Sequence, residues 1–344
     1  MSFFRPSRGL LAMGLSFTFR RSSMIWNCVA LLICCNGSVG DAADNLTSNP
    51  KSRSFTFFYG ATINELAPGS KAKVWLPVAS SDHDQTVELL VARTPGSTHF
   101  TTEREFGNKL IYFEAVADAR GEIVVDVEYK ITRRELSIAT AEAASDGAPE
   151  HLKSSSMIPV DGRLLRTLVD DQTVDGDNLA GIRKLYDAVD DLMSYEKPIG
   201  KPWGRGDALW ACDAHYGNCT DFHSIFIGAC RDLHVPAKFE MGFSIPEKYG
   251  EGEISGYHCW AKFIQNGRWI PVDISEADKN PMLKDYYFGN LNVDRVKFSE
   301  GREFDLEPRS ELGKVNFLVY PHVEVNGQVH TKFVKRFRYA DLSN

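Results

Sequence analysis

The period of the hydrophobic residues changes once along this chain, near residue 177. From Ser54 to about Leu136, apolar and aromatic residues form short β-branched runs separated by turn residues. After Asp177, apolar residues recur at spacings of three and four, which is the period of an amphipathic α-helix. We therefore expect an α+β fold, in which a β-rich N-terminal domain precedes a mixed domain that contains helices.

The N-terminal region predicts several short strands, and strands at such spacing favour a β-sandwich. The runs are 54–59, 71–78, 87–91, 110–113 and 122–131. Polar segments at 41–53 and 137–176 lack periodicity and are interpreted as linkers. These borders predict a β-rich domain over 54–136 and a second domain over 177–344, which ends in a β extension. That extension includes a hairpin within 315–339 that turns at Asn326-Gly327.

Two helices are predicted after residue 177. The first follows a cap at Asp177-Asn178, and the second begins at Cys219 and ends before Pro236. Their apolar faces comprise Leu179, Ile182, Leu185, Tyr186, Val189 and Met193 in the first, and Phe222, Ile225, Phe226, Ala229 and Leu233 in the second.

The N-terminus has the parts of a secretory signal peptide. Arg20-Arg21 precede an apolar run over 24–35, and small residues follow it. We predict a signal peptide over 1–40 and export to the periplasm or the outside, with an uncleaved anchor helix as the alternative. A net charge of −7 without a basic stripe argues against nucleic acid as a partner. No later stretch is apolar enough to cross a membrane, so the mature form is expected to have no membrane segment.

Four cysteines follow the predicted signal peptide: Cys212, Cys219, Cys230 and Cys259. An even number in an exported protein suggests disulfides. If Cys219 is to stay a free nucleophile, at most one bridge can form, and it must be drawn from the other three. The sequence leaves the pairing open.

Cys219 stands where a thiol becomes reactive. It follows Gly217-Asn218 and opens the predicted helix, where the helix dipole and unpaired N–H groups favour a thiolate. The same N–H groups can hold a developing oxyanion. The alternative is a structural cysteine buried at the start of a helix.

A predicted hairpin gives His258 and Asp273 a reason to meet. Its strands are joined by Asn266-Gly267, a two-residue turn that fixes the register. Gln265 then faces Arg268, Trp260 faces Asp273, and His258 faces Ser275. His258 and Asp273 therefore share one face of the hairpin, within reach of a hydrogen bond. Pro271 lacks an N–H and predicts an edge position or a bulge.

Other residues offer competing interpretations. His223 lies four residues after Cys219 and is either an alternative base or a packing residue, and packing is favoured. Cys212, His215, Cys219 and His223 have metal-like spacing, but a zinc site would consume Cys219, so we predict no metal. Trp210, Trp260 and Tyr257 either line an acyl-group cleft, supply an oxyanion donor or belong to the core.

Several separate motifs occur in order along residues 177–290. They are Gly217-Asn218-Cys219, the segment 231–239, Gly242-Phe243, His258-Cys259-Trp260 and the segment 269–273. Together they resemble the transglutaminase-like superfamily of cysteine enzymes. The resemblance implies a papain-like core in which Cys219 is the nucleophile, His258 its base and Asp273 the residue that orients the base. Lys238 stands where members usually carry arginine, a departure expected to affect the fold rather than the chemistry.

The resemblance implies a cysteine enzyme without a cofactor that acts on carboxamide or peptide bonds of a protein or peptide substrate. Such a triad forms an acyl-enzyme that is resolved by water, as in a peptidase or amidase, or by an amine, as in a transglutaminase. Hydrolysis is favoured for an exported bacterial-type member, and no calcium-binding loop pattern is evident. The alternative is a catalytically silent module that uses this fold to bind protein or glycan.

Overall fold

The computed structural model describes residues 51–145, 148–169 and 174–343. The predicted signal peptide and residues 41–50 of the first predicted linker lie outside the described residues, so the predictions made for them stay predictions. No helix in the described ranges has the length and apolarity needed to span a membrane.

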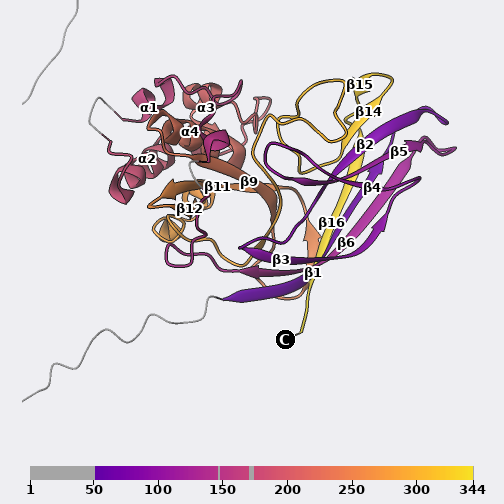
Figure 1. The fold of residues 1–344 in the computed structure, drawn as a ribbon, viewed down its shortest axis with the longest axis horizontal. Helices are drawn as coiled ribbons and strands as arrows, with labels where there is room; N and C mark the ends of the chain where they lie inside the picture. The colour runs from indigo at the N-terminus through magenta and orange to yellow at the C-terminus, as the bar shows by residue number, and fades with distance from the viewer. Residues whose placement is uncertain (1–50, 146–147, 170–173, 344) are drawn as a thin grey trace, which may run out of the picture. The chain divides into compact units, whose positions relative to one another are not determined.

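Two five-stranded sheets make up the β-rich part of the molecule (Figure 1). All five strands predicted from the N-terminal region form, and their inward-facing residues belong to one hydrophobic core. The strands of this part are β1 (Ser52–Ile63), β2 (Lys71–Val78), β3 (Gln85–Arg93), β4 (His99–Thr102), β5 (Lys109–Val116), β6 (Ile123–Arg134), β10 (Glu251–Ile254), β14 (His322–Val325), β15 (Gln328–Val329) and β16 (Phe333–Asp341). The sheet orders are β10-β16-β1-β6-β3 and β15-β14-β2-β5-β4. Strand β4 was not predicted, because it has only four residues, none of them buried.

The C-terminal strands complete the N-terminal sheets. Strand β16 pairs antiparallel with β1 from Phe55↔Asp341 to Ile63↔Phe333, and β14 pairs with β2. The predicted hairpin turns at Asn326-Gly327, where both residues have the positive φ of such turns. The sequence analysis assigned this extension to the second domain, whereas its strands pair with strands of the first. The change of hydrophobic period near residue 177 therefore does not mark a border between two independent sheets.

The remaining elements build a helix-and-sheet core around one buried helix. The helices are α1 (Arg163–Leu168), α2 (Leu179–Leu192), α3 (Ala208–Ala214), α4 (Cys219–Asp232) and α5 (Ile274–Lys279), with 3-10 turns η1 (Pro149–Leu152) and η2 (Pro281–Leu283). The sheet order is β12-β11-β9-β13, from β9 (Ala237–Ser244), β11 (His258–Gln265), β12 (Arg268–Val272) and β13 (Arg295–Glu300). A short parallel pair joins β7 (Ser194–Tyr195) to β8 (Tyr216–Gly217).

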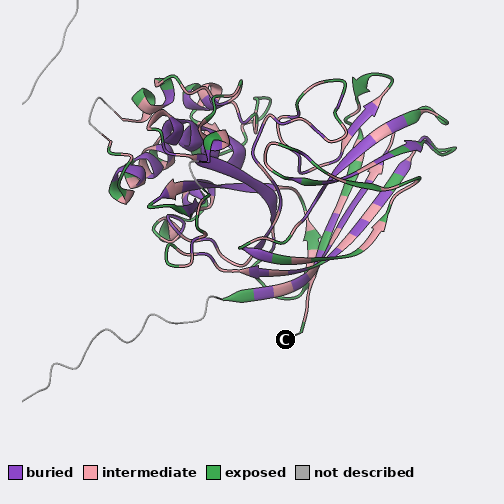
Figure 2. Ribbon diagram, viewed as in Figure 1, coloured by how far each residue is buried: buried purple, intermediate pink, exposed green. Residues whose placement is uncertain are grey.

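Helix α4 is the centre of this core. All its residues from Cys219 to Arg231 are buried, and the helix packs against β9 and β11 with α1, α2 and α3 around it (Figures 1 and 2). Gly228 permits the close approach of α1, because a Cβ there would lie 2.2 Å from Leu164 Cδ1. Both predicted helices are confirmed: α2 is capped by the Asn178 side chain, and α4 ends before Pro236.

A buried ion cluster joins the β-rich part to this core. Lys262 of β11 bonds Asp84, which precedes β3, and its Nζ lies 3.0 Å from Glu240 Oε1 on β9. All three side chains are almost fully buried. Each charge therefore depends on its partners for the solvation that water no longer provides.

Replacing Lys262 with methionine is expected to lower the free energy of unfolding by about 3–5 kcal/mol, because two buried carboxylates lose their nearest cation and keep only Arg133 and Lys297 at 3.6 Å. Urea titration measures the change. Lys130→Met, at an exposed position on β6, is the matched control and is expected to change stability by less than about 0.5 kcal/mol. Equal urea midpoints of unfolding for the two variants would contradict the claim that Lys262 stabilises the buried carboxylates.

Candidate active site

Cys219 occupies the first position of α4, and its surroundings are fixed by a capping box. The Asn218 side chain accepts from the Thr220 N–H at 2.9 Å, and Asp221 Oδ2 accepts from the Asn218 N–H at 2.9 Å. Gly217 is required here, because a Cβ would lie 2.5 Å from the Asp221 carboxylate. Among the described residues, the Cys219 N–H has no hydrogen-bond partner. The thiol therefore sits beside a free donor at a helix N-terminus, as predicted.

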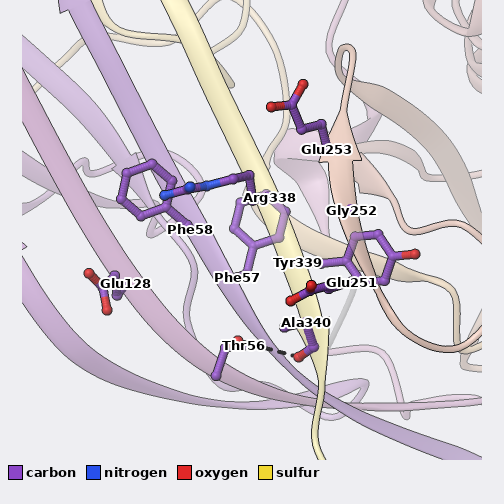
Figure 3. Close-up of a pocket in the computed structure, with 10 residues that line it drawn as sticks. All are labelled: Thr56, Phe57, Phe58, Glu128, Glu251, Gly252, Glu253, Arg338, Tyr339 and Ala340. Carbon is purple, nitrogen blue, oxygen red and sulfur yellow. Dashed lines mark hydrogen bonds between the residues drawn. The ribbon is translucent and has the colours of Figure 1, made fainter.

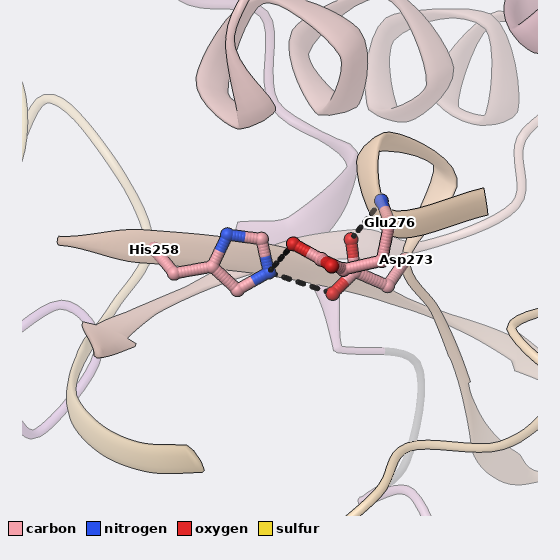
Figure 4. A group of neighbouring side chains, drawn as sticks. All are labelled: His258, Asp273 and Glu276. Atoms are coloured by element: carbon pink, nitrogen blue, oxygen red, sulfur yellow. Dashed lines mark hydrogen bonds and ion pairs between the residues drawn. The ribbon is translucent and has the colours of Figure 1, made fainter. Parts of the chain in front are cut away.

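His258 and Asp273 are in direct contact. His258 Nε2 lies 2.7 Å from Asp273 Oδ2, and the other ring nitrogen points away from the carboxylates (Figure 4). Asp273 is held on every side: Oδ1 accepts from the Ser275 hydroxyl at 3.0 Å and from the Glu276 N–H at 3.2 Å. Oδ2 also accepts from Arg295 Nη1 at 3.0 Å. The carboxylate that orients the imidazole is thus itself oriented.

The predicted hairpin register is correct, but the strand ends earlier than expected. The pairs from Gln265↔Arg268 to Ala261↔Val272 form as predicted. Strand β12 ends at Val272, however, and Asp273 caps α5, so the predicted pairings of Asp273 with Trp260 and of Ser275 with His258 do not form. Asp273 reaches His258 from a helix cap, not from a strand. Pro271 lies on the edge strand, as predicted.

The electrostatics favour a thiolate–imidazolium pair. Burial opposes the charge on Cys219, but the neighbouring Cys259 thiol and His258 imidazole lower the pKa of the Cys219 thiol well below its ordinary value. Burial also opposes the charge on His258, but the Asp273 carboxylate and the neighbouring Cys219 raise the pKa of the imidazole to about 10. With Nε2 bonded to Asp273, Nδ1 is the ring nitrogen left for the thiol. Both shifts keep the proton on His258 and the charge on sulfur.

A cleft of about 780 Å³ opens beside these residues. His258, Asn218, Tyr257 and Glu276 line it, and Cys219, which follows Asn218 in the chain, has 1% of its surface exposed. Trp203 also lines the cleft, and its indole N–H is buried without a hydrogen-bond partner among the described residues.

Residues 166–274 match the model of the transglutaminase-like superfamily. This segment is a transglutaminase-like domain. A crystal structure from Cytophaga hutchinsonii, of a protein described as a candidate cysteine protease, shares the fold with a TM-score of 0.56 and 13% identity. That similarity covers 86% of this chain and 92% of the other.

A relative in Haemophilus influenzae, an uncharacterized protein, is 31% identical over 37% of this chain. The match covers 43% of the relative, so the chain spans less than half of that protein's length.

Of the aromatic residues considered from the sequence, only Tyr257 lines the cleft of the transglutaminase-like domain. Trp260 is a core residue whose indole N–H bonds Glu240 and whose ring lies between Arg133 and Arg295. Trp210, on α3, instead contacts Arg205, which precedes the helix, and Tyr216 of β8.

Sequence reasoning missed two functional candidates, Trp203 and Arg295. Trp203 lies in a glycine-rich loop, residues 200–206, that precedes Cys219, and this loop was the signal available in the sequence. The N–H groups of Gly204 and Gly206 bond the Asp221 carboxylate at 2.8 and 2.7 Å, which fixes this loop against the start of α4. No local signal marked Arg295, which reaches Asp273 from β13, 22 residues further along the chain.

His223 is a packing residue, as favoured. Its Nε2 accepts the Ile274 backbone N–H at 3.1 Å, so that nitrogen carries no proton, and burial lowers the pKa of the ring. The four residues with metal-like spacing do not form a zinc site. Within the described ranges, no cluster of ligand atoms is formed by Cys212, His215, Cys219 and His223.

A different group of possible metal ligands exists in the described part of the chain. It comprises His258, Asp273 and Glu276, whose ligand atoms lie within 4.8 Å of one another. Arg295 already occupies Asp273 Oδ2, and Nε2 of His258 is bonded to the same oxygen. These contacts fit a hydrogen-bonded ion pair better than a cation site.

All four cysteines of the described chain are free and buried. The one in contact with the candidate nucleophile is Cys259, whose sulfur lies 3.7 Å from Thr220 Oγ1 and 3.8 Å from His223 Nδ1. Its thiol donates to Thr220, and burial together with the neighbouring Cys219 sulfur raises the pKa of Cys259 well above its ordinary value. Cys259 therefore stays protonated and stabilises the neighbouring thiolate.

Replacing Cys259 with alanine is expected to raise the pKa of Cys219, since a neighbouring group that favours the charged form is lost. The rate of Cys219 alkylation by iodoacetamide is then expected to be about tenfold lower at a pH below the midpoint of the Cys219 titration. Well above that midpoint, the rate is expected to be unchanged. Cys230→Ala, which changes a buried cysteine further along α4, is the control. It is expected to leave the pH profile of Cys219 alkylation unchanged. A Cys259→Ala profile identical to the wild type would show that this thiol has no electrostatic role.

A second hollow of about 570 Å³ lies along β10, β16, β1 and β6 (Figure 3). It is lined by Phe58, over whose ring the Arg338 guanidinium lies at 4.4 Å, and by Glu128 and Glu251. Glu253 of β10 borders both this hollow and the cleft beside His258. Strand β10 therefore separates the two.

Proposed function

We propose that this transglutaminase-like domain is a cysteine hydrolase that cleaves carboxamide or peptide bonds through an acyl-enzyme on Cys219. The observation that carries the proposal is the buried contact of His258 with Asp273, with Arg295 beneath it, at a cleft above the start of α4. A base oriented in this way keeps a nearby cysteine ionised.

In the first half of the proposed reaction, the Cys219 thiolate attacks the carbonyl carbon and a C–S bond forms. We assign the oxyanion to the backbone N–H of Cys219 and the indole N–H of Trp203, neither of which has a hydrogen-bond partner among the described residues. His258 then gives its proton to the departing nitrogen, and the C–N bond breaks. An amine leaves, and a thioester remains on Cys219.

In the second half, water enters the cleft and attacks the thioester. His258 takes one proton from the water, the C–S bond breaks, and the carboxylic acid product leaves. The thiolate–imidazolium pair is restored. Asp273 holds the ring in one orientation and stabilises its charge in both halves.

Hydrolysis is proposed over cross-linking on two grounds. The solved protein of similar fold is described as a candidate cysteine protease. In addition, the sequence carries no calcium-binding loop pattern of the regulated cross-linking type. Water and amine nucleophiles differ only in the second half of the reaction, so product analysis in the presence of an amine distinguishes them.

The 1% exposure of Cys219 favours one alternative, a silent module that binds protein or glycan. Cleavage of a mixture of amide-containing peptides, followed by mass spectrometry, tests the proposal. We expect Cys219→Ala to lose at least about 1,000-fold in rate, and Cys212→Ala, a buried cysteine on α3, to retain activity. An active Cys219→Ala variant would rule the hydrolase out.

We also propose that the domain acts on a protein or peptide outside the cytoplasm, because the segment 1–40 has the composition of a secretory signal. Cell fractionation and the N-terminal sequence of the mature protein test this. A cytoplasmic protein that retains residues 1–40 would contradict it.

A further inference from the structure

Three lysines line the cleft beside His258, and each lies over an aromatic ring of the same cleft. The distances from Nζ to the ring centroid are 3.9 Å for Lys279 over Tyr195, 4.0 Å for Lys335 over Tyr320 and 5.1 Å for Lys197 over Trp203. A ring face attracts an ammonium group and restricts the long side chain that carries it. The rings therefore hold the positive charges over the cleft, where the Lys197 and Lys335 side chains stay exposed to an incoming ligand.

Two of these three charges have no carboxylate partner among the described residues. Lys279 is paired with Glu276 at 2.7 Å. Neither Lys197 nor Lys335 forms an ion pair within the described part of the chain, and partial burial lowers the pKa of Lys335. The remaining acid of the cleft is Glu253, on β10. The cleft thus keeps a net positive charge in a chain whose net charge is −7.

Each unpaired lysine is connected to a different part of the candidate site. Lys197 lies over Trp203, in the loop that Asp221 holds against the start of α4. Lys335 lies over Tyr320, whose hydroxyl accepts the Tyr257 N–H at 2.9 Å, directly before His258. The two ammonium groups therefore come from separate segments, one on the nucleophile side and one on the base side.

We infer that the acyl donor of this cleft is an acidic peptide, with free carboxylates that bind Lys197 and Lys335 on either side of the scissile amide. This inference rests on the proposed hydrolase function. Ammonium groups on restrained side chains bind carboxylates as point charges and lose less side-chain entropy than mobile lysines do. The same arrangement disfavours a basic peptide, because like charges would meet at close range.

The test uses two fluorescent peptides that differ only in having glutamate or glutamine at the positions flanking the scissile amide. Binding to the inactive full-length Cys219→Ala protein, followed by fluorescence anisotropy, gives the affinities without turnover. The acidic peptide is expected to bind at least tenfold more tightly at low salt. This ratio is expected to approach one at 1 M NaCl, where surface charges are screened.

The lysines are tested in the same Cys219→Ala background. Lys197→Gln and Lys335→Gln are each expected to lower the acidic-to-neutral ratio about fivefold, and the double variant to bring it close to one. Lys332→Gln, an exposed lysine outside the cleft, is the matched control and keeps the ratio. Equal affinity for the two peptides, or a ratio that survives the double variant, would overturn the inference.

The failure of this inference differs from the failure of the proposed function. Cleavage of both peptides at equal rates by the wild type would leave the hydrolase in place and remove the charge preference. Tight, lysine-dependent binding of the acidic peptide without cleavage would identify the ligand class and exclude hydrolysis as the function of the cleft.

Discussion

Replacing His258 with alanine is expected to lower kcat/KM for amide cleavage by about 1,000-fold or more. The variant loses the group that protonates the departing amine and activates water. It also loses the cation that keeps Cys219 ionised, so fewer groups offset the effect of burial and the pKa of the thiol rises. Both effects lower kcat/KM.

The pH dependence separates these two effects. In the wild type, the reactive pair exists above the depressed pKa of Cys219 and disappears as pH rises through the His258 pKa of about 10. Iodoacetamide alkylation of Cys219 is therefore expected to remain fast well below pH 7, whereas in His258→Ala it requires alkaline pH. His99→Ala, an exposed histidine on β4, is the control. Identical profiles for His258→Ala and the wild type would exclude His258 as the partner of the thiolate.

Replacing Asp273 with alanine is expected to damage both activity and stability. Arg295 would remain buried without its carboxylate, which costs about 3–5 kcal/mol, and α5 would lose its cap, which costs about 1 kcal/mol more. The imidazole would lose its orientation and the charge that raises its pKa, for a further loss of about 100-fold or more in kcat. Urea unfolding and steady-state kinetics measure the two effects separately.

Asp273→Asn separates orientation from structure. An amide oxygen can still accept from Ser275 and from the Glu276 N–H, so most of the cap is expected to survive. The neutral amide no longer stabilises an imidazolium, so kcat is expected to stay at least about 100-fold below that of the wild type. Near-normal kcat in Asp273→Asn would show that the charge of Asp273 does not act through His258.

Local chemistry made the centre of the site predictable from sequence. The Asn266-Gly267 turn fixed the hairpin register, and the Gly217-Asn218 pair placed Cys219 at a helix start. The contact between His258 and Asp273 was also predicted, although through a strand pairing that does not form. Asp273 leaves the strand because its side chain caps α5, and a cap residue still lies close to the end of the strand it follows.

Contacts between distant segments were not predictable in the same way. The alternation in β16 indicates a buried face, but it carries no information about its partner, and β1 lies more than 250 residues earlier. Arg295 reaches Asp273 from β13, and Lys335 reaches the cleft from the last strand. Only the assembled sheets bring these residues to the site.

The most direct test of the central claim, that Cys219 is an acylated nucleophile, is intact-protein mass spectrometry after rapid acid quenching during turnover of an amide peptide. The account predicts a mass increase equal to the acyl part of the peptide, located on Cys219 by peptide mapping and absent from Cys219→Ala. Turnover by the wild type without any adduct, together with an active Cys219→Ala variant, would contradict it.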